Sequence, residues 1–279
     1  MADNNIRLTT LSAFLVLFVL LLQSHIAISQ PVADNMEFGY QKGSELGPEN
    51  WGRVHKEWAA CGQGRMQSPV DLSDDRVEVL PLLGFLRSSY RPVTTVLKNR
   101  GHDIMLRFEG NVGGVQIDGI DYALKQLHWH LPTEHTINGR RFDMELHMVH
   151  QSADNRNAVV GILYTLGPSE PFLAKMEKYI DMVKDRYEVE EAVGMVDPSE
   201  IEIGSNQYYR YTGSLTTPPC TEGVVWTIIN EVRTVSSEQL RLLSEAVRDD
   251  ASMNARPVQS INDRRIGLFR PAETIKLMI

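Results

Sequence analysis

Between residues 93 and 165 the sequence divides into six short runs of strand-forming residues, separated by turn residues such as Asn138-Gly139. Short runs bounded by turn residues are typical of β-strands joined by tight connections. A seventh run, Val224–Val232, also reads as a strand. The sequence therefore predicts a strand-dominated domain. The six runs are Val93–Leu97, Asp103–Phe108, Gly114–Ile117, Tyr122–His130, Phe142–Val149 and Ala158–Thr165.

Two segments carry the 3.6-residue apolar period of amphipathic helices. The first covers about 171–186 and the second about 237–249. Ser236 is the predicted N-cap of the second helix, with Gln239 three residues later as in a capping box. Because these helices are few, we expect them at the periphery of a single, mainly β domain.

The N-terminus begins with an apolar run that is too short to cross a membrane comfortably. Residues 11–22 form this run and Arg7 precedes it, whereas a membrane-spanning helix needs about 20 residues. The small residues Ala27 and Ser29 then provide a cleavage site. We therefore predict a signal peptide over 1–29; a buried core helix and a signal anchor are the alternatives.

The mature domain is predicted to be 30–279, with no membrane anchor after cleavage. We expect a secretory route that ends outside the cell. The net charge of −8 argues against nucleic acid as a partner, because nucleic-acid binding needs a basic face. A small anionic substrate is compatible with that charge.

The chain has two cysteines, too few for a disulfide scaffold or a cysteine-rich zinc site. In an oxidising compartment Cys61 and Cys220 are expected to pair; two buried free thiols are the alternative. A bridge that closes a loop of this length contributes roughly 5 kcal/mol in the chain-entropy model.

Four histidines lie close together in the sequence between residues 128 and 147. His128 and His130 stand two apart in a predicted strand, where side chains two apart share one face about 7 Å from each other. His147 lies in the next predicted strand, which the Asn138-Gly139 connection would place antiparallel to the first. The three imidazoles can therefore converge on one ion.

Three imidazoles without a thiolate suit Zn²⁺ with an open fourth position, which is the arrangement of catalytic zinc sites. Gln126 and Glu145 each stand two residues before a predicted ligand, on the same face of its strand. Ligand histidines usually donate their other ring N–H to such a group. The alternative is that the histidine pair on the first strand is an ordinary surface feature.

Several motifs, in this order along the chain, resemble the α-carbonic anhydrases and in particular their plant members. The resemblance covers about 38–272 and implies that family's fold, a large, mostly antiparallel, twisted β-sheet with short helices around it. The motifs are Gly47-Pro-Glu-Asn-Trp51, Gln67-Ser-Pro-Val-Asp71, Asn99-Arg-Gly-His102, Gln126-Leu-His-Trp-His130, Glu134-His-Thr136, Glu145-Leu-His-Met-Val-His150, Tyr211-Thr-Gly-Ser-Leu-Thr-Thr-Pro-Pro-Cys220 and Asn254-Ala-Arg-Pro-Val-Gln259.

The resemblance assigns roles to individual residues. His128, His130 and His147 align with the three zinc ligands of the family. Thr216 matches the hydroxyl that accepts a hydrogen bond from zinc-bound hydroxide and donates one to Glu134.

Further positions match the substrate pocket and the proton pathway. Thr217 lies beside the substrate, and His102 matches the histidine that shuttles protons, for which the ordinary imidazole pKa near 6.5 is suitable. Cys61 and Cys220 match the disulfide of secreted members. The apolar substrate pocket corresponds to Val149, Val159, Leu215 and Trp226.

A few positions depart from common members of the family. Leu131, Leu127 and Met105 change the expected polarity of the cavity, and Arg100 is adjacent to the predicted shuttle. The other histidines of the mature chain are expected to be structural: His55, His135 and His150.

The resemblance implies a zinc lyase that reversibly hydrates CO₂ to bicarbonate and a proton. A non-catalytic binding or storage protein on the same fold is the first alternative. A zinc esterase activity, which would use the same hydroxide, is the second. The resemblance to plant members implies the apoplast as the extracellular destination, with the plastid stroma, reached through the secretory route, as the alternative. The sequence does not predict an oligomeric state.

Overall fold

The computed structural model describes residues 37–203, 207–248 and 251–271. The predicted signal peptide, 1–29, lies outside the described residues. Everything below concerns the described residues.

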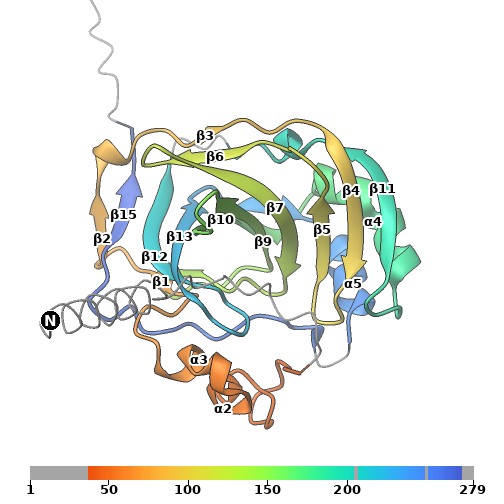
Figure 1. The fold of residues 1–279 in the computed structure, drawn as a ribbon, viewed down its shortest axis with the longest axis horizontal. Coiled ribbons are helices and arrows are strands. Elements are labelled where there is room, and N and C mark those ends of the chain that lie inside the picture. The colour runs from red at the N-terminus through yellow and green to blue at the C-terminus, as the bar shows by residue number, and fades with distance from the viewer. Residues whose placement is uncertain (1–36, 204–206, 249–250, 272–279) are drawn as a thin grey trace, which may run out of the picture. The chain divides into compact units, whose positions relative to one another are not determined.

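One large sheet organises the domain (Figure 1). Within the described residues it has 13 strands, in the order β11-β4-β5-β7-β9-β10-β13-β12-β15-β2, with β14 beside β10, β6 beside β7 and β3 beside β6. The strands are β2 (Val77–Val79), β3 (Arg87–Ser88), β4 (Val93–Asn99), β5 (Ile104–Phe108), β6 (Gly114–Ile117), β7 (Ile120–His130), β9 (Met144–Ser152), β10 (Asn157–Leu166), β11 (Glu190–Val196), β12 (Tyr208–Ser214), β13 (Glu222–Ile229), β14 (Arg233–Val235) and β15 (Ile266–Phe269).

The pairing is mostly antiparallel, as predicted. β10 pairs in parallel with β13 and β14, and β15 with β2, while the other neighbours in this sheet are antiparallel. A separate two-stranded parallel sheet joins β1 (Asp71–Leu72) to β8 (Thr136–Ile137). The mainly β fold expected from the sequence is therefore confirmed.

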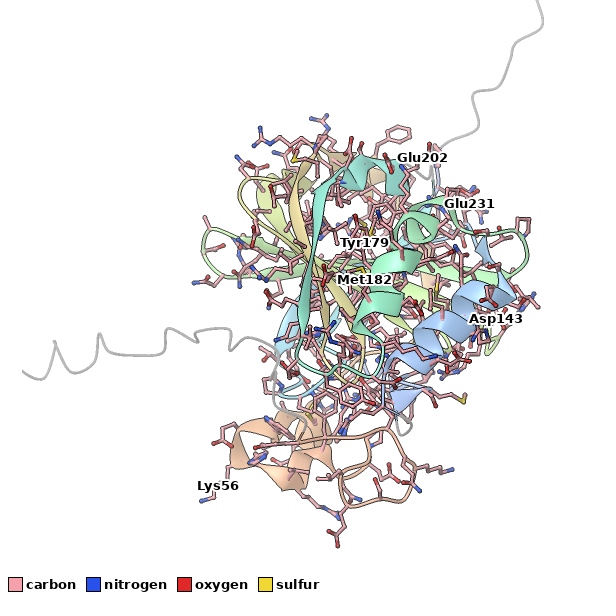
Figure 2. All side chains as sticks on the ribbon, turned by 90° about the vertical axis from the view of Figure 1, so that its right-hand side faces the viewer. Lys56, Asp143, Tyr179, Met182, Glu202 and Glu231 are labelled. Carbon is pink, nitrogen blue, oxygen red and sulfur yellow. A yellow bond between two sulfur atoms is a disulfide. The ribbon has the colours of Figure 1, made fainter. Side chains whose placement is uncertain are left out.

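The helices are short and lie outside the sheet. Tyr179 on α4 (Pro171–Val183) donates its hydroxyl to the Val193 carbonyl of β11 at 3.0 Å. Figure 2 shows Tyr179 and Met182 on this helix beside the sheet. No helix among the described residues has both the length and the apolar character needed to cross a membrane. The helices are α2 (Trp51–Val54), α3 (Ala60–Gln63), α4 (Pro171–Val183) and α5 (Ser237–Ala246), with 3₁₀ turns η1 (Lys56–Trp58), η2 (Pro81–Leu83) and η3 (Pro198–Ile201).

The predicted ends of three elements were wrong by a few residues. α4 ends at Val183 because the chain turns there, and Asp185 has a positive φ of 56°. α5 ends at Ala246, although its capping box between Ser236 and Gln239 is confirmed. The predicted strand to residue 232 stops at Ile229, after which the chain turns into β14.

β10 shows how the sheet builds two cores. Val159 and Leu163 belong to one apolar cluster, whereas Val160 and Ile162 belong to a second. Alternate residues of a strand point to opposite faces, so both faces of the sheet are buried here. A strand covered on both faces is a rigid support for side chains that project from its neighbours.

The predicted disulfide between Cys61 and Cys220 is present. It links α3 to the loop between β12 and β13 across 159 residues of sequence. The bridge therefore ties a remote N-terminal segment to the loop that carries Thr216 and Thr217.

Removing this bridge is expected to destabilise the protein. The variant Cys61→Ser/Cys220→Ser should lose about 2–5 kcal/mol of unfolding free energy, because its unfolded chain is no longer restricted by the cross-link. Urea denaturation at pH 7 measures the loss. A reducing agent should weaken the parent protein but not the variant; equal stability of parent and variant would contradict the prediction.

Candidate active site

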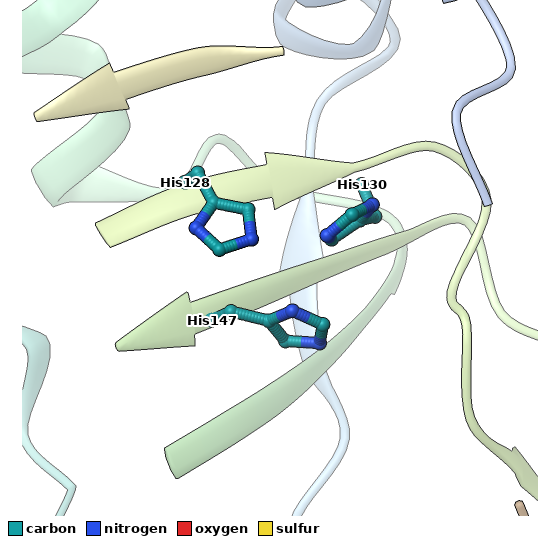
Figure 3. Close-up of side chains that lie close together, drawn as sticks. All are labelled: His128, His130 and His147. Carbon is teal, nitrogen blue, oxygen red and sulfur yellow. The ribbon is translucent and has the colours of Figure 1, made fainter. Parts of the chain in front are cut away.

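Two central strands bring the three predicted zinc ligands together. β7 carries His128 and His130, and β9 pairs with it so that His147 lies opposite His128. The three imidazoles lie close together on one face of this strand pair (Figure 3). Each offers one ring nitrogen, and these nitrogens lie within 4.8 Å of one another.

The other nitrogen of each imidazole is already used. Each donates a hydrogen bond to a fixed oxygen, which sets the ring orientation and the tautomer. Nε2 of His128 and His130 and Nδ1 of His147 are therefore left facing the shared space. The bonds run from His128 Nδ1 to Gln126 Oε1, from His130 Nδ1 to the Asn254 carbonyl and from His147 Nε2 to Glu145 Oε1, all at 2.8 Å.

The donor set fits Zn²⁺. Burial lowers the pKa of His128 and of His147, so both are neutral and able to bind a metal. Among the described residues, buried Nε2 of His130 has no hydrogen-bond partner, and neither has Oε2 of Glu134, which lies 3.7 Å from it. A buried imidazole nitrogen and a carboxylate oxygen left without partners in this way are compatible with a bound cation.

Glu145 holds much of the site in place. Its Oε2 accepts the backbone N–H groups of Glu134 and His135, both at 2.8 Å. Its Oε1 accepts Nδ1–H of His135 at 2.7 Å and Nε2–H of His147 at 2.8 Å. Burial alone would raise the pKa of Glu145, but the two histidines hold it well below the usual range.

A second histidine and carboxylate group, formed by His135, Glu145 and His147, also has metal-ligand spacing. Its members are joined at hydrogen-bond distances, and His135 Nε2 accepts from the Tyr211 hydroxyl at 2.7 Å. This group therefore acts as a hydrogen-bonded support for His147. His135 is buried and hydrogen-bonded through both ring nitrogens, and its purely structural role stays a prediction.

The Glu134 carboxylate lies next to the three imidazoles. Its Oε1 accepts the backbone N–H of Arg256 at 2.8 Å, and its Oε2 lies 4.0 Å from Nδ1 of His147. Glu134 is fully buried. The carboxylate is thus fixed beside the triad with one oxygen available as an acceptor.

The loop that carries Thr216 and Thr217 is held firmly, and both threonines are buried. Before it, Ser214 and Ser68 exchange hydrogen bonds through N–H and Oγ at 2.9 and 3.0 Å. After it, Cys220 donates its N–H to the Thr217 carbonyl at 2.9 Å and joins the disulfide. The backbone that carries the two threonines is therefore held on both sides.

The predicted apolar residues form one wall. Val159 pairs with Val149 across β9 and β10 and with Trp226 across β10 and β13. Together with Leu215 they belong to one apolar cluster, in which Val149 is only partly buried. Val149 stands two residues after His147 on the same face of β9, so the wall is next to the histidines.

His102 is placed differently from an exposed proton carrier. Its side chain is 1% exposed, and its ring centroid lies 4.8 Å from that of Phe38. Burial lowers the pKa of His102 to about 4. The expectation of an ordinary imidazole pKa was therefore wrong, although the shuttle role itself stays a prediction.

Four other residues from the sequence analysis lie in or near the sheet or on the surface, as follows. Met105 pairs with His128 across β5 and β7 and shares its face, whereas Leu127 packs in the core on the opposite face. His55 contacts the Glu37 carboxylate at 2.5 Å, and His150 hydrogen-bonds the Tyr90 hydroxyl at 2.7 Å.

Buried neutral histidines make the fold sensitive to acid. Burial lowers the pKa of His150 to about 4, as it does for His102. Below pH 6.5 the unfolded chain takes up protons on these imidazoles, whereas the folded chain does so only near pH 4. Stability is therefore expected to be complete above pH 6.5 and to fall between pH 6.5 and about 4, by about 3 kcal/mol for each group.

Urea denaturation of the parent and of His150→Gln at pH 7 and pH 4.5 tests this dependence. The glutamine does not titrate, so the variant should lose less stability between the two pH values than the parent. An equal loss in both proteins would show that His150 does not contribute.

Sequence reasoning missed Asn254, which supplies the carbonyl for His130 and accepts the Leu131 N–H through its side chain at 2.7 Å. It also missed Arg256, although both lie in a motif that was noticed. Strand periodicity could not find them, because each acts from a loop more than a hundred residues away in sequence.

The chain is similar to known carbonic anhydrases over most of its length. The family model of the eukaryotic-type carbonic anhydrases matches residues 46–269. Alpha carbonic anhydrase 7 of Arabidopsis thaliana is 53% identical over 240 residues, covering 86% of this chain and 87% of that protein. Dioscorin dioA3 of Dioscorea japonica is 44% identical over 261 residues, covering 93% of this chain and 96% of that protein.

Solved structures show the same relationship. A crystal structure of dioscorin complexed with ascorbate matches with a TM-score of 0.83 at 45% identity, over 85% of this chain and 100% of that one. The α-carbonic anhydrase of Thermovibrio ammonificans, in complex with the inhibitor sulfanilamide, matches with a TM-score of 0.74 at 33% identity. That match covers 82% of this chain and 98% of the other.

Proposed function

Because this chain belongs to the eukaryotic-type carbonic anhydrase family, we propose that it catalyses the reversible hydration of CO₂ to bicarbonate and a proton, with zinc as its cofactor. The observation that carries the proposal is the set of three buried imidazoles with converging nitrogens and fully occupied outer nitrogens. A surface histidine pair would not need such fixed partners.

His128, His130 and His147 would hold the metal. When bound, Zn²⁺ supplies a hydroxide nucleophile at neutral pH, since it lowers the pKa of water from 15.7 to about 7. Neutral ligands leave the charge of the ion undiminished, which favours this effect. Burial, which lowers the pKa of His128 and His147, supports that protonation state.

Thr216 and Glu134 would orient the nucleophile. An ionised carboxylate only accepts hydrogen bonds, so a threonine hydroxyl that bonds to Glu134 must donate its proton there. Its oxygen can then accept only from the other side, where the nucleophile arrives. The fixed backbone around Thr216, the hydrogen bond that Glu134 Oε1 accepts from Arg256 N–H and the unpartnered Glu134 Oε2 support this preorganised arrangement.

The apolar wall would receive CO₂. The substrate has no net charge and no hydrogen to donate, so a dry surface accommodates it without leaving polar groups unpaired. Val149, Val159 and Leu215 offer such a surface next to the histidines. Thr217, from the same loop as Thr216, would line the position beside it.

We also propose that the protein follows the secretory route, as its first 29 residues predict. The disulfide supports this proposal, because such bonds persist in oxidising compartments. Plant alpha carbonic anhydrases among the relatives are compatible with it. The extracellular space or apoplast is the proposed destination.

A non-catalytic binding role on the same fold is the second candidate. The similarity to dioscorin, which has been crystallised with ascorbate, is the observation in its favour. A protein of this kind would bind zinc without hydrating CO₂ faster than the solution reaction. The retained Glu134, Thr216 and three histidines favour catalysis.

A stopped-flow assay of CO₂ hydration with a pH indicator tests the proposal. The purified protein should accelerate acidification well above the uncatalysed rate, and it should do so in proportion to its concentration. A variant of the wall, Val149→Tyr, should raise KM or abolish activity by filling the site. Zinc-loaded protein without activity would instead support the binding role.

A further inference from the structure

The turn between β4 and β5 is fixed from several sides. Asn99 donates through Nδ2 to the carbonyls of Val183 at 3.0 Å and Ala246 at 2.6 Å, which tie the turn to α4 and α5. Asn254 donates to the carbonyl of His102 at 2.8 Å. The backbone around His102 is therefore tied to both helices and to the loop of Asn254.

A buried carboxylate lies next to this histidine. Asp103 Oδ2 is 3.6 Å from Nε2 of His102, and Nε2 has no hydrogen-bond partner among the described residues. Asp103 is held by Arg100, whose Nε donates to Oδ1 at 2.7 Å and whose Nη2 contacts Oδ2. The Arg100 and Asp103 side chains are both almost completely buried.

Asp103 is the anionic group among the charges that act on His102. Burial lowers the pKa of His102, and Arg100, Arg248 and His130 act in the same direction, while Asp103 opposes them. Burial would raise the pKa of Asp103 itself, but Arg100 holds it well below the usual range. The carboxylate is therefore ionised at neutral pH.

We propose that Asp103 is a positioning residue for proton export: it faces Nε2 of His102, fixes the ring and stabilises the imidazole while it carries a proton. Arg100 keeps the carboxylate in place for this role. The proton moves from the reaction site to His102 and then to buffer, and Asp103 stays ionised throughout. The inference rests on the proposed function and on the predicted shuttle role of His102.

The test measures CO₂ hydration by the whole protein in a stopped-flow instrument at low buffer concentration. At saturating CO₂ the turnover rate kcat includes proton export, whereas kcat/KM reports only the encounter with CO₂ and its conversion. Asp103→Asn should therefore lower kcat about tenfold, the effect of one pKa unit, and leave kcat/KM within about twofold. Added imidazole buffer should restore kcat.

Asp154→Asn is the matched control, since Asp154 also pairs with an arginine, Arg156 at 2.8 Å, but is exposed. It should match the parent in both constants. In a His102→Ala background, Asp103→Asn should cause no further loss of kcat, because the two residues act as one unit.

The single variant leaves the guanidinium of Arg100 buried without its carboxylate, which can unfold the protein. The variant Arg100→Gln/Asp103→Asn removes both charges and answers this difficulty. If Asp103 only neutralises Arg100, kcat recovers in the double variant; if it positions the shuttle, kcat stays low. Parental kcat in Asp103→Asn at low buffer would overturn the inference, whereas an inactive parent would overturn the proposed function instead.

Discussion

Replacing His130 with alanine is expected to abolish zinc binding and CO₂ hydration together. His130 is fully buried, and its Nε2 faces the shared space while Nδ1 donates to the Asn254 carbonyl. Two imidazoles remain in the variant, and catalytic zinc sites use three protein ligands. Without the ion, hydroxide is scarce at neutral pH, so activity should fall by about three orders of magnitude or more.

Metal analysis and stopped-flow CO₂ hydration measure the two effects. His55→Ala is the control: this histidine is partly exposed and pairs with Glu37 far from the triad in sequence, so zinc content and activity should be unchanged. Stoichiometric zinc with undiminished activity in His130→Ala would contradict the assignment of the ligands.

Replacing Glu145 with glutamine is expected to destabilise the fold strongly, although the two side chains have the same shape. The carboxylate accepts four hydrogen bonds, from two backbone N–H groups and two imidazoles. A glutamine side chain offers one acceptor oxygen and two donors, so at least two buried donors would face another donor. Breaking a buried charged network of this kind costs about 3–5 kcal/mol.

The same change should weaken zinc binding about 10- to 100-fold, because His147 loses the partner that orients it. Urea denaturation and competition with a chelator measure stability and affinity separately. Glu238→Gln, at an exposed position on α5 that pairs with Arg241, should leave both unchanged. Unfolding of Glu145→Gln at the parental urea concentration would contradict this account of the network.

Much of the fold follows from local patterns in the sequence. Strands bounded by turn residues, such as β6 and β7, were predicted closely, because a two-residue turn with positive φ at Asp118 and Gly119 joins them. β11 and β12 were missed for another reason. β11 begins within a run of acidic residues that reads as a solvated surface, and its pairing with β4, about a hundred residues away in sequence, is a tertiary effect.

The site, like the fold, has parts that local sequence patterns predicted and parts that depend on distant segments. The period of two along a strand predicted that His128, His130, Gln126 and Glu145 would share one face and pair as they do. It could not predict that Glu145 also accepts a hydrogen bond from His135. Nor could it predict that the Asn254 carbonyl, from a distant loop, accepts the hydrogen bond of His130 Nδ1. The burial of His102 under Phe38 was also unpredictable, because it depends on a segment sixty residues earlier.

Gly161 is a smaller example of a constraint that only the structure makes visible. It lies opposite His147 on β10, and a Cβ there would come within 2.6 Å of Ile228 Cδ1 and 3.1 Å of Glu145 Oε1. The absence of a side chain thus leaves room for the carboxylate that supports His147. In the sequence this glycine is an unremarkable residue within a strand.

The central claim is that three buried histidines hold a zinc ion on which CO₂ hydration depends. Its most direct test is stopped-flow CO₂ hydration by the purified protein before chelation, after complete removal of zinc, and after one equivalent of Zn²⁺ is returned. The account predicts high activity, loss of activity to the uncatalysed rate, and recovery in step with the bound zinc. Activity that persists in metal-free protein, or that does not return with stoichiometric zinc, would contradict it.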